Sequence, residues 1–292
     1  MELRNKIITR KHGLWKNKRD HLYKVLSEFE KATKVRDWIK AGDPKPRLDN
    51  LREEVMPDGN YTNAAQWFLD REEFRNWHHQ FWNPKDPASV KRFLWVYCTY
   101  GTGKTTLIYR TYTELKKEQR NGPRNGAIRI VPYFCDASKA SGPSYETILR
   151  ALIWHMSWLP DATLAQEARK AYVNVQDPDA ELGITFWQNL FLELIEESED
   201  QFVFIIDALD ECKELEDRNK FLRFMTDKVM SRSNVHLLCS SHKHVPVDNH
   251  FKADRRFDIE VNRAATLEDM RTYIDGELQR RERYSLESAF CK

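Results

Sequence analysis

A short apolar run, followed at once by a glycine-rich turn and a helical pattern, constrains this chain more than any other feature. The run is FLWVYC (93–98), the turn is TYGTGKT (99–105), and the helical pattern covers residues 104–120. A strand that passes through glycines into a helix turns backbone N–H groups and the positive end of the helix dipole towards one point. We therefore expect a chain of phosphates to bind at this turn.

The residue types in the turn suit phosphate and magnesium. Gly101 and Gly103 remove Cβ atoms that would hinder a backbone folded around phosphate oxygens. Lys104 supplies a positive charge to the outer phosphates, and the Thr105 hydroxyl is placed to ligate Mg²⁺. Cys98 stands where the usual G-x-x-x-x-G-K-[ST] pattern has its first glycine. The predicted nucleotide contacts in the turn are Gly101, Thr102, Gly103, Lys104, Thr105 and Thr106.

A second apolar run, about a hundred residues later, ends on acids. In FVFIIDALDEC (202–212) the buried strand ends at Asp207, whose carboxylate can hold Mg²⁺ opposite Thr105. Asp210 and Glu211 follow on the next turn, and either can orient or deprotonate an attacking water. We rank Glu211 before Asp210 as the catalytic carboxylate, and Lys104 is the third predicted catalytic residue. The alternative is that both acids cap the following helix.

Strands and helices alternate from Phe93 onward. Such alternation predicts an α/β fold with a mainly parallel sheet covered on both faces, a three-layer αβα arrangement with its ligand beyond the carboxyl ends of the strands. We expect strands at 93–98, 128–135, 201–207 and 235–241, and helices at 104–120, 144–158, 161–173, 184–198, 214–230 and 266–281.

The first third of the chain has a different pattern. We expect a helix over 17–41, a break at AGDPKPR (41–47), and an aromatic helix over 64–82 whose rings pack in a core. Residues 1–63 are thus predicted to be a basic helical extension, and residues 64–292 the main domain. Residues 1–50 carry 14 Lys/Arg against 7 Asp/Glu, but both signs are mixed and the net charge is only +2. This favours a solvated helical surface over a nucleic-acid partner.

The run VHLLCSSHKHVP (235–246) supplies a third polar strand end. In a parallel sheet this end lies beside the phosphate turn, so Ser240, Ser241 and His242 are candidates to sense the terminal phosphate. We take Ser241 as the nucleotide contact. The guanine-reading N-K-x-D pattern is absent, which favours ATP over GTP.

Cysteines and hydropathy bear on the compartment. The five cysteines form no C-x-x-C pair, so we expect reduced, buried thiols. The N-terminus lacks an unbroken apolar stretch, and no apolar run approaches the roughly 20 residues that span a bilayer. The expectation is a soluble cytoplasmic protein without a membrane span.

Taken together, these segments resemble the NACHT-type NTPase domain of the STAND superfamily, and especially the fungal receptor-like proteins whose domain is described as nephrocystin-like at its N-terminus. The resemblance covers roughly residues 64–278. It is carried by AAQWFLDREEFRNW (64–77), FLWVYCTYGTGKTTL (93–107), VPYFCDAS with ETILRALIWHM (131–138 and 146–156), and FVFIIDALDEC (202–212).

The resemblance implies a signalling switch that binds ATP or GTP with Mg²⁺, hydrolyses it slowly, and self-associates or meets other receptor-type domains. Two residues depart from the family pattern: Cys98, and His242 where an arginine is usual after the serine pair. The family's winged-helix and repeat regions would lie beyond Lys292, and an effector domain in front. The resemblance therefore implies a truncated switch core.

Two other functions stay open from the sequence. The first is a non-catalytic scaffold that keeps the fold but has lost efficient hydrolysis, which Cys98 and His242 motivate. The second is a small-molecule kinase, against which stands the lack of a separate acceptor-site motif.

Overall fold

The computed structural model describes residues 28–41, 45–55, 65–82, 91–99, 101–121, 128–136, 142–159, 163–175, 177, 180–212 and 214–264, and, beyond these, residues 266, 267, 269–271, 274, 275 and 278. Cys291 and residues 17–27 of the first predicted helix lie outside the described residues.

A five-stranded parallel sheet forms the centre of the fold. Its strands are β1 (Phe93–Cys98), β2 (Ile128–Phe134), β3 (Gln201–Asp207), β4 (Val235–His242) and β5 (Arg256–Val261), in the spatial order β2-β3-β4-β1-β5. All four pairings are parallel, so the carboxyl ends of the strands lie at one edge of the sheet. β4 lies between β1 and β3, and its register places His242 opposite Cys98.

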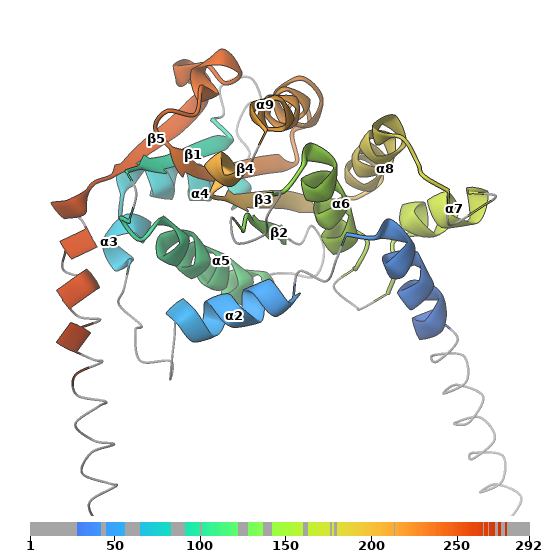
Figure 1. Ribbon diagram of the computed structural model, residues 1–292, viewed down its shortest axis with the longest axis horizontal. Helices are drawn as coiled ribbons and strands as arrows, with labels where there is room; N and C mark the ends of the chain where they lie inside the picture. Colours follow the sequence, from blue (N-terminus) through green and yellow to red (C-terminus); the bar gives the residue numbers. More distant parts are fainter. Residues whose placement is uncertain are drawn as a thin grey trace, which may run out of the picture.

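Helices cover both faces of the sheet (Figure 1). One face carries α2 (Lys45–Val55), α3 (Gln66–Leu69), α4 (Glu72–Trp82) and α5 (Lys104–Asn121). The other carries α6 (Tyr145–Met156), α7 (Gln166–Asn174), α8 (Ile184–Glu196) and α9 (Leu215–Phe224), together with a helical segment over residues 28–39. This is the three-layer αβα arrangement that the alternating pattern predicted.

β3 shows how one strand supplies two cores. Phe202, Phe204 and Ile206 belong to the core on the α6–α9 side. Val203 and Ile205 point to the other face and pack with α5. Because successive side chains on a strand point to opposite faces, a strand buried on both sides must be apolar throughout. The carboxylate of Asp207 is therefore an exception that needs partners.

The four predicted strands are confirmed to within one residue, but β5 was not anticipated. Its sequence, RFDIEV, lacks the continuous apolar run that marked the others. β5 is an edge strand that pairs only with β1 among the described strands, so charged residues are tolerated along it. Ile259 and Val261 are buried in the core, and the partly buried Phe257 packs against it.

Three helical predictions need correction. The predicted aromatic helix over 64–82 is broken at Asp70 and Arg71, between α3 and α4. The predicted helix over 161–173 begins only at Gln166. The predicted break at 41–47 overlaps the start of α2, a helix that was not predicted because of the prolines. Pro46 lies in the first turn of α2, where a backbone N–H has no partner within the helix, so the proline does not disrupt it. Among the described residues, no helix combines the length and apolarity needed to cross a bilayer.

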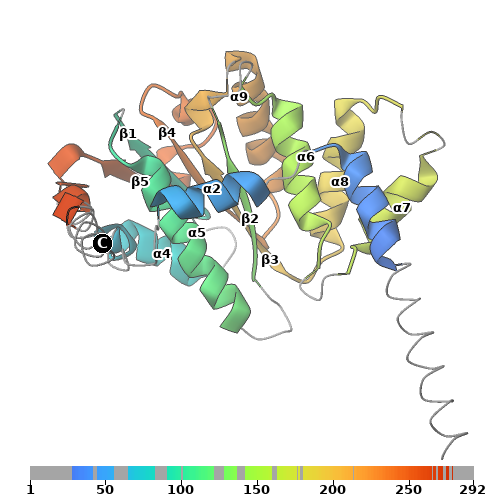
Figure 2. The ribbon, with the colours of Figure 1, turned by 60° about the horizontal axis from the view of Figure 1, so that its bottom comes forward.

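The segment over residues 28–39 packs into the core on the α6–α9 side. Figures 1 and 2 both show it, in dark blue, beside α7 and α8. Trp38 is 5% exposed, and its ring contacts Tyr172, Phe186 and Trp187 at centroid distances of 5.5, 5.8 and 5.2 Å. The Arg150 guanidinium donates to the carbonyl of Ile39 and lies over the Trp187 ring. The boundary at 63/64 stays a prediction, but this part of the extension shares the core of the main domain.

Replacing Trp38 tests that shared core. Trp38→Ala should lower the free energy of unfolding by about 3–5 kcal/mol, because it leaves a large cavity among aromatic rings. Phe29→Ala is the matched control on the same helical segment; its ring is 63% exposed, so we expect a change within about 0.5 kcal/mol. Denaturant unfolding measures both, and equal small effects would show that the segment is not part of the cooperative unit.

Candidate functional site

The turn between β1 and α5 has the backbone that its glycines predicted, for a different reason. Gly101 and Gly103 have φ of +72° and +77°, in the left-handed region that favours glycine. A Cβ added to either would meet no atom within 4 Å. The constraint in this state is thus the backbone angle, and open space lies beside both residues. α5 starts directly after the turn, and the Leu107 N–H donates to the carbonyl of Gly103.

Two side chains close the turn on itself. The Thr102 hydroxyl, 3% exposed, donates to the carbonyl of Thr99 at 3.1 Å. The Cys98 thiol donates to the same carbonyl, and burial raises the pKa of that thiol. Cys98 therefore fits the first position of the turn as a small buried group. Cys135, Cys212 and Cys239 are likewise buried and free, which confirms the thiol prediction for the four described cysteines.

Asp207 lies at the buried carboxyl end of β3. It is 1% exposed, and Oδ1 accepts a hydrogen bond from the Ser240 hydroxyl at 2.5 Å. Burial raises the pKa of Asp207, and Ser240, Thr105 and Lys104 each lower it. The pKa of Asp207 is raised overall, so these three groups offset the cost of a buried carboxylate only in part.

The oxygen set at Asp207 fits a magnesium ion. Oδ2 of Asp207 is buried and makes no hydrogen bond to any described residue. The Thr105 hydroxyl lies close enough to lower the pKa of this carboxyl. A carboxylate oxygen with unused acceptor capacity beside a hydroxyl is the hard-oxygen environment that Mg²⁺ prefers. Thr105 and Asp207, from segments about a hundred residues apart, are thus brought together.

The chain turns sharply after Asp207 and brings Asp210 back to the phosphate turn. Ala208 has φ 53° and ψ 48°, a left-handed conformation that is uncommon for alanine, and its N–H donates to the Ser240 hydroxyl at 2.8 Å. After this turn, Oδ1 of Asp210 lies 3.5 Å from Nζ of Lys104. Both side chains are largely buried, at 8% and 11% exposed.

Asp210 also contacts His242. Its Oδ1 accepts from the backbone N–H of His242 at 2.9 Å, and Oδ2 lies 3.3 Å from Nε2 of the ring. The other ring nitrogen, Nδ1, lies 3.1 Å from the carbonyl oxygen of Cys98. Burial lowers the pKa of His242, and Asp210 raises it. Lys104, Asp210, His242 and Cys98 thus form one chain of contacts.

Glu211 has a different set of neighbours from Asp210. Its backbone N–H closes the short turn onto Ala208 at 2.8 Å. Its carboxylate lies close enough to Cys135 to raise the pKa of that buried thiol. The structure therefore brings the second-ranked acid, Asp210, to Lys104. The ranking of Glu211 before Asp210 has no support from these contacts.

The two serines of β4 divide between the faces of the sheet. Both are fully buried, but Ser240 reaches Asp207 whereas the Ser241 hydroxyl accepts from the indole Nε1 of Trp95 at 2.8 Å. Sequence reasoning chose Ser241 and missed the role of Ser240. The alternation of side chains along β4 was the available clue, because only one of two successive residues can lie on the same face of the sheet as Asp207.

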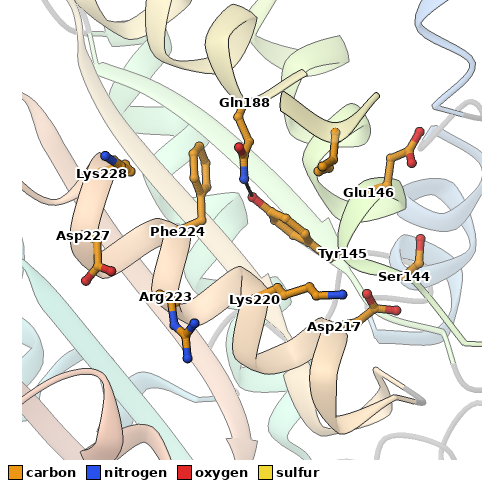
Figure 3. A pocket seen from close by; sticks show the side chains of 11 residues that line it. Ser144, Tyr145, Glu146, Gln188, Asp217, Lys220, Arg223, Phe224, Asp227 and Lys228 are labelled. Atoms are coloured by element: carbon orange, nitrogen blue, oxygen red, sulfur yellow. Dashed lines mark hydrogen bonds between the residues drawn. The ribbon is translucent and has the colours of Figure 1, made fainter. Parts of the chain in front are cut away.

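A separate open hollow lies between α6, α8 and α9, with a volume of 490 Å³. Figure 3 shows Tyr145, Phe224 and Lys220 in its walls, with the Gln188 amide donating to the Tyr145 hydroxyl at 2.9 Å. Lys220 is ion-paired with Glu216 at 2.8 Å. None of the lining residues comes from the phosphate turn or the end of β3, so this hollow is distinct from the candidate site.

The sheet order, the glycine turn after β1 and the acidic end of β3 define a three-layer P-loop fold. The chain matches the family described as nephrocystin 3, N-terminal, over residues 63–242, which is more than half of its length. It therefore belongs to that family. The resemblance to nephrocystin-like, NACHT-type NTPase domains is thereby confirmed.

One curated relative and two solved structures are also similar. The vegetative incompatibility protein HET-E-1 of Podospora anserina is 25% identical over 243 residues, 81% of this chain and 16% of that protein. Cdc6p from Pyrobaculum aerophilum is 14% identical, with a TM-score of 0.46 over 72% of this chain and 48% of that chain. The Aeropyrum pernix Orc1 protein in complex with DNA is 12% identical, with a TM-score of 0.41 over 72% and 49%. Likeness at these TM-scores says nothing of what this chain binds.

The serine pair offers a matched test of the site. Ser240→Ala should lower the free energy of unfolding by about 2–3 kcal/mol, because it leaves a buried carboxylate oxygen and the Ala208 N–H without a partner. Ser241→Ala removes two neutral hydrogen bonds, one from the Trp95 indole and one to the His242 carbonyl, and should cost about 1–2 kcal/mol because no carboxylate loses a partner. Denaturant unfolding of both variants checks the order, and the reverse order would contradict the assignment of Ser240 to Asp207.

Proposed function

We propose that this chain binds ATP with Mg²⁺ and hydrolyses it slowly, as the switch core of a signalling protein that self-associates or meets other receptor-type domains. The observation that carries this proposal is the convergence of Lys104 and Thr105 with Asp207 at one edge of the sheet. An ammonium, a hydroxyl and a carboxylate at the end of a glycine turn are the groups that bind a triphosphate and its metal.

Each residue has a stated part in binding. The N–H groups at the start of α5 face the phosphates, with Gly101, Thr102, Gly103 and Thr106 forming the turn around them. Lys104 leaves Asp210 to pair with the outer phosphates. Thr105 and Oδ2 of Asp207 would hold Mg²⁺, which neutralises charge on the phosphate oxygens. GTP is the second nucleotide candidate, since no described contact selects the base.

Hydrolysis needs a carboxylate that orients or deprotonates the attacking water. Asp210 is the better candidate by position, because it lies 3.5 Å from Lys104 at the phosphate turn. Glu211 remains the second candidate, one residue further along the same turn. The competing proposal is a scaffold that binds nucleotide without efficient turnover, and the replacement of the first turn glycine by Cys98 favours it.

Nucleotide binding can be tested by thermal unfolding. ATP with Mg²⁺ at about a hundred times the dissociation constant should stabilise the wild type by about 2.7 kcal/mol. Lys104→Ala should lose this gain. Lys117→Ala is the matched control on the same helix, since its side chain is 60% exposed and forms a surface ion pair with Glu114. The absence of a shift with every nucleotide at millimolar concentration would refute the binding proposal.

Turnover separates the switch from the scaffold. Asp210→Asn should reduce the rate of phosphate release about 10²–10⁴-fold, if this carboxylate acts as a general base. Glu211→Gln should have a smaller effect. The measurement is single-turnover hydrolysis of labelled ATP by both variants, the wild type and Lys104→Ala. Equal background rates in all four proteins would favour the scaffold, and a loss confined to Glu211→Gln would restore the sequence-based ranking.

A further inference from the structure

The imidazole of His242 lies between two hydrogen-bond acceptors. Nδ1 faces the carbonyl oxygen of Cys98 at 3.1 Å, and Nε2 faces Oδ2 of Asp210 at 3.3 Å. A neutral imidazole has one N–H and one bare nitrogen, so it can donate to only one of these oxygens. The imidazolium donates to both. These two acceptors favour the imidazolium, but burial and the Lys104 ammonium oppose it, so the pKa of His242 is lowered overall in this structure.

The Asp210 carboxylate is shared between the Lys104 ammonium and the His242 ring. Lys104 contacts Oδ1 and the His242 ring contacts Oδ2, while the backbone N–H of His242 also donates to Oδ1. The ring and the carboxylate are 7% and 8% exposed. At such burial the Asp210 charge is poorly screened by water, so withdrawal of the Lys104 ammonium increases the electrostatic attraction of Asp210 for a proton on the His242 ring.

Charged and titratable groups from several segments of the chain surround His242. Lys104 comes from the phosphate turn and Asp210 from the turn after β3. His244 follows on the same chain and stacks on the ring at a centroid distance of 5.5 Å. Burial, Lys104 and His244 lower the pKa of His242, whereas Asp210 and the Cys98 carbonyl raise it. If Lys104 moves away, one of the influences that lower the pKa of His242 is removed.

We propose that His242 is a positioning residue that takes up a proton when nucleotide binds, so that its imidazolium holds Asp210 in place once phosphates draw Lys104 away. The proposal rests on the proposed nucleotide binding and adds a regulatory property to that site. An arginine at this position would keep its charge at every physiological pH, whereas a histidine makes the charge conditional on pH and on the ligand.

The sign of the pH dependence follows from the charges. Phosphates add negative charge near the ring and remove the ammonium from Asp210, so the pKa of His242 is higher with nucleotide bound than without it. Proton uptake then accompanies binding, and binding tightens as the pH falls. The gain is lost as the pH rises through the titration of the bound form. Each unit by which binding raises this pKa appears as about a tenfold change in Kd.

The test is calorimetric titration of the wild type with a non-hydrolysable ATP analogue and Mg²⁺. We expect Kd to be about three- to tenfold tighter near pH 6 than near pH 8, with net proton uptake detected by using buffers of different ionisation enthalpy. His242→Gln is the matched variant, because its amide N–H lies about where Nε2 lies but does not titrate. The ratio of variant to wild-type Kd cancels the ionisation of the nucleotide itself. In the variant the extra proton uptake should vanish.

The outcomes separate the two proposals. If the wild type binds nucleotide but His242→Gln shows the same proton uptake, the role of His242 is refuted and nucleotide binding stands. If the wild type binds no nucleotide at any pH, both proposals fail.

A second measurement does not depend on how well the His242→Gln variant folds. The histidine ring C–H signals of labelled protein carrying His244→Gln, which removes the stacked neighbour, are titrated with and without the analogue. A midpoint that moves to higher pH on binding supports the proposal. If no midpoint rises, the proposal is overturned.

Discussion

The rest of the site depends on the carboxyl group at the buried end of β3, where burial raises the pKa of Asp207. Asp207 is as buried as the apolar residues before it, and an uncompensated charge there would be strongly unfavourable. Compensation comes from Ser240 on β4 and from Thr105 and Lys104 at the start of α5. β4 can supply that serine because it stands between β1 and β3 in the sheet. The strand order therefore brings a hydrogen-bond partner to the carboxyl group of Asp207.

The folded unit extends beyond the family match on both sides. Residues 28–39 lie before residue 63, yet they complete the core on the α6–α9 side. β5 lies after residue 242, yet it covers the free edge of β1, the strand that leads into the phosphate turn. Further on, the Asp269 carboxylate accepts from the Ala65 N–H and the Trp67 indole, which ties the last described helical residues to α3. Of these additions, β5 directly supports β1, the strand from which the turn leaves.

The two residues that depart from the family pattern, Cys98 and His242, are in contact with each other. Cys98 and His242 lie 144 residues apart and pair across β1 and β4. The carbonyl of Cys98 and the carboxylate of Asp210 fix the ring of His242 from two sides. The first position of the phosphate turn is thus connected to Lys104 by the contacts of His242 and Asp210.

The sequence by itself determined the layers of the fold and the two ends of the site. Continuous apolar runs specify β1 to β4 because a strand covered on both faces has no polar side, and the spacing of Gly101, Gly103, Lys104 and Thr105 specifies a phosphate turn locally. Only the tertiary structure decided which acid meets Lys104 and which serine meets Asp207. Those choices depend on the left-handed turn at Ala208 and on the register of β4 against its neighbours. Residues one position apart in sequence, such as Ser240 and Ser241 or Asp210 and Glu211, therefore have different neighbours that no local pattern distinguishes.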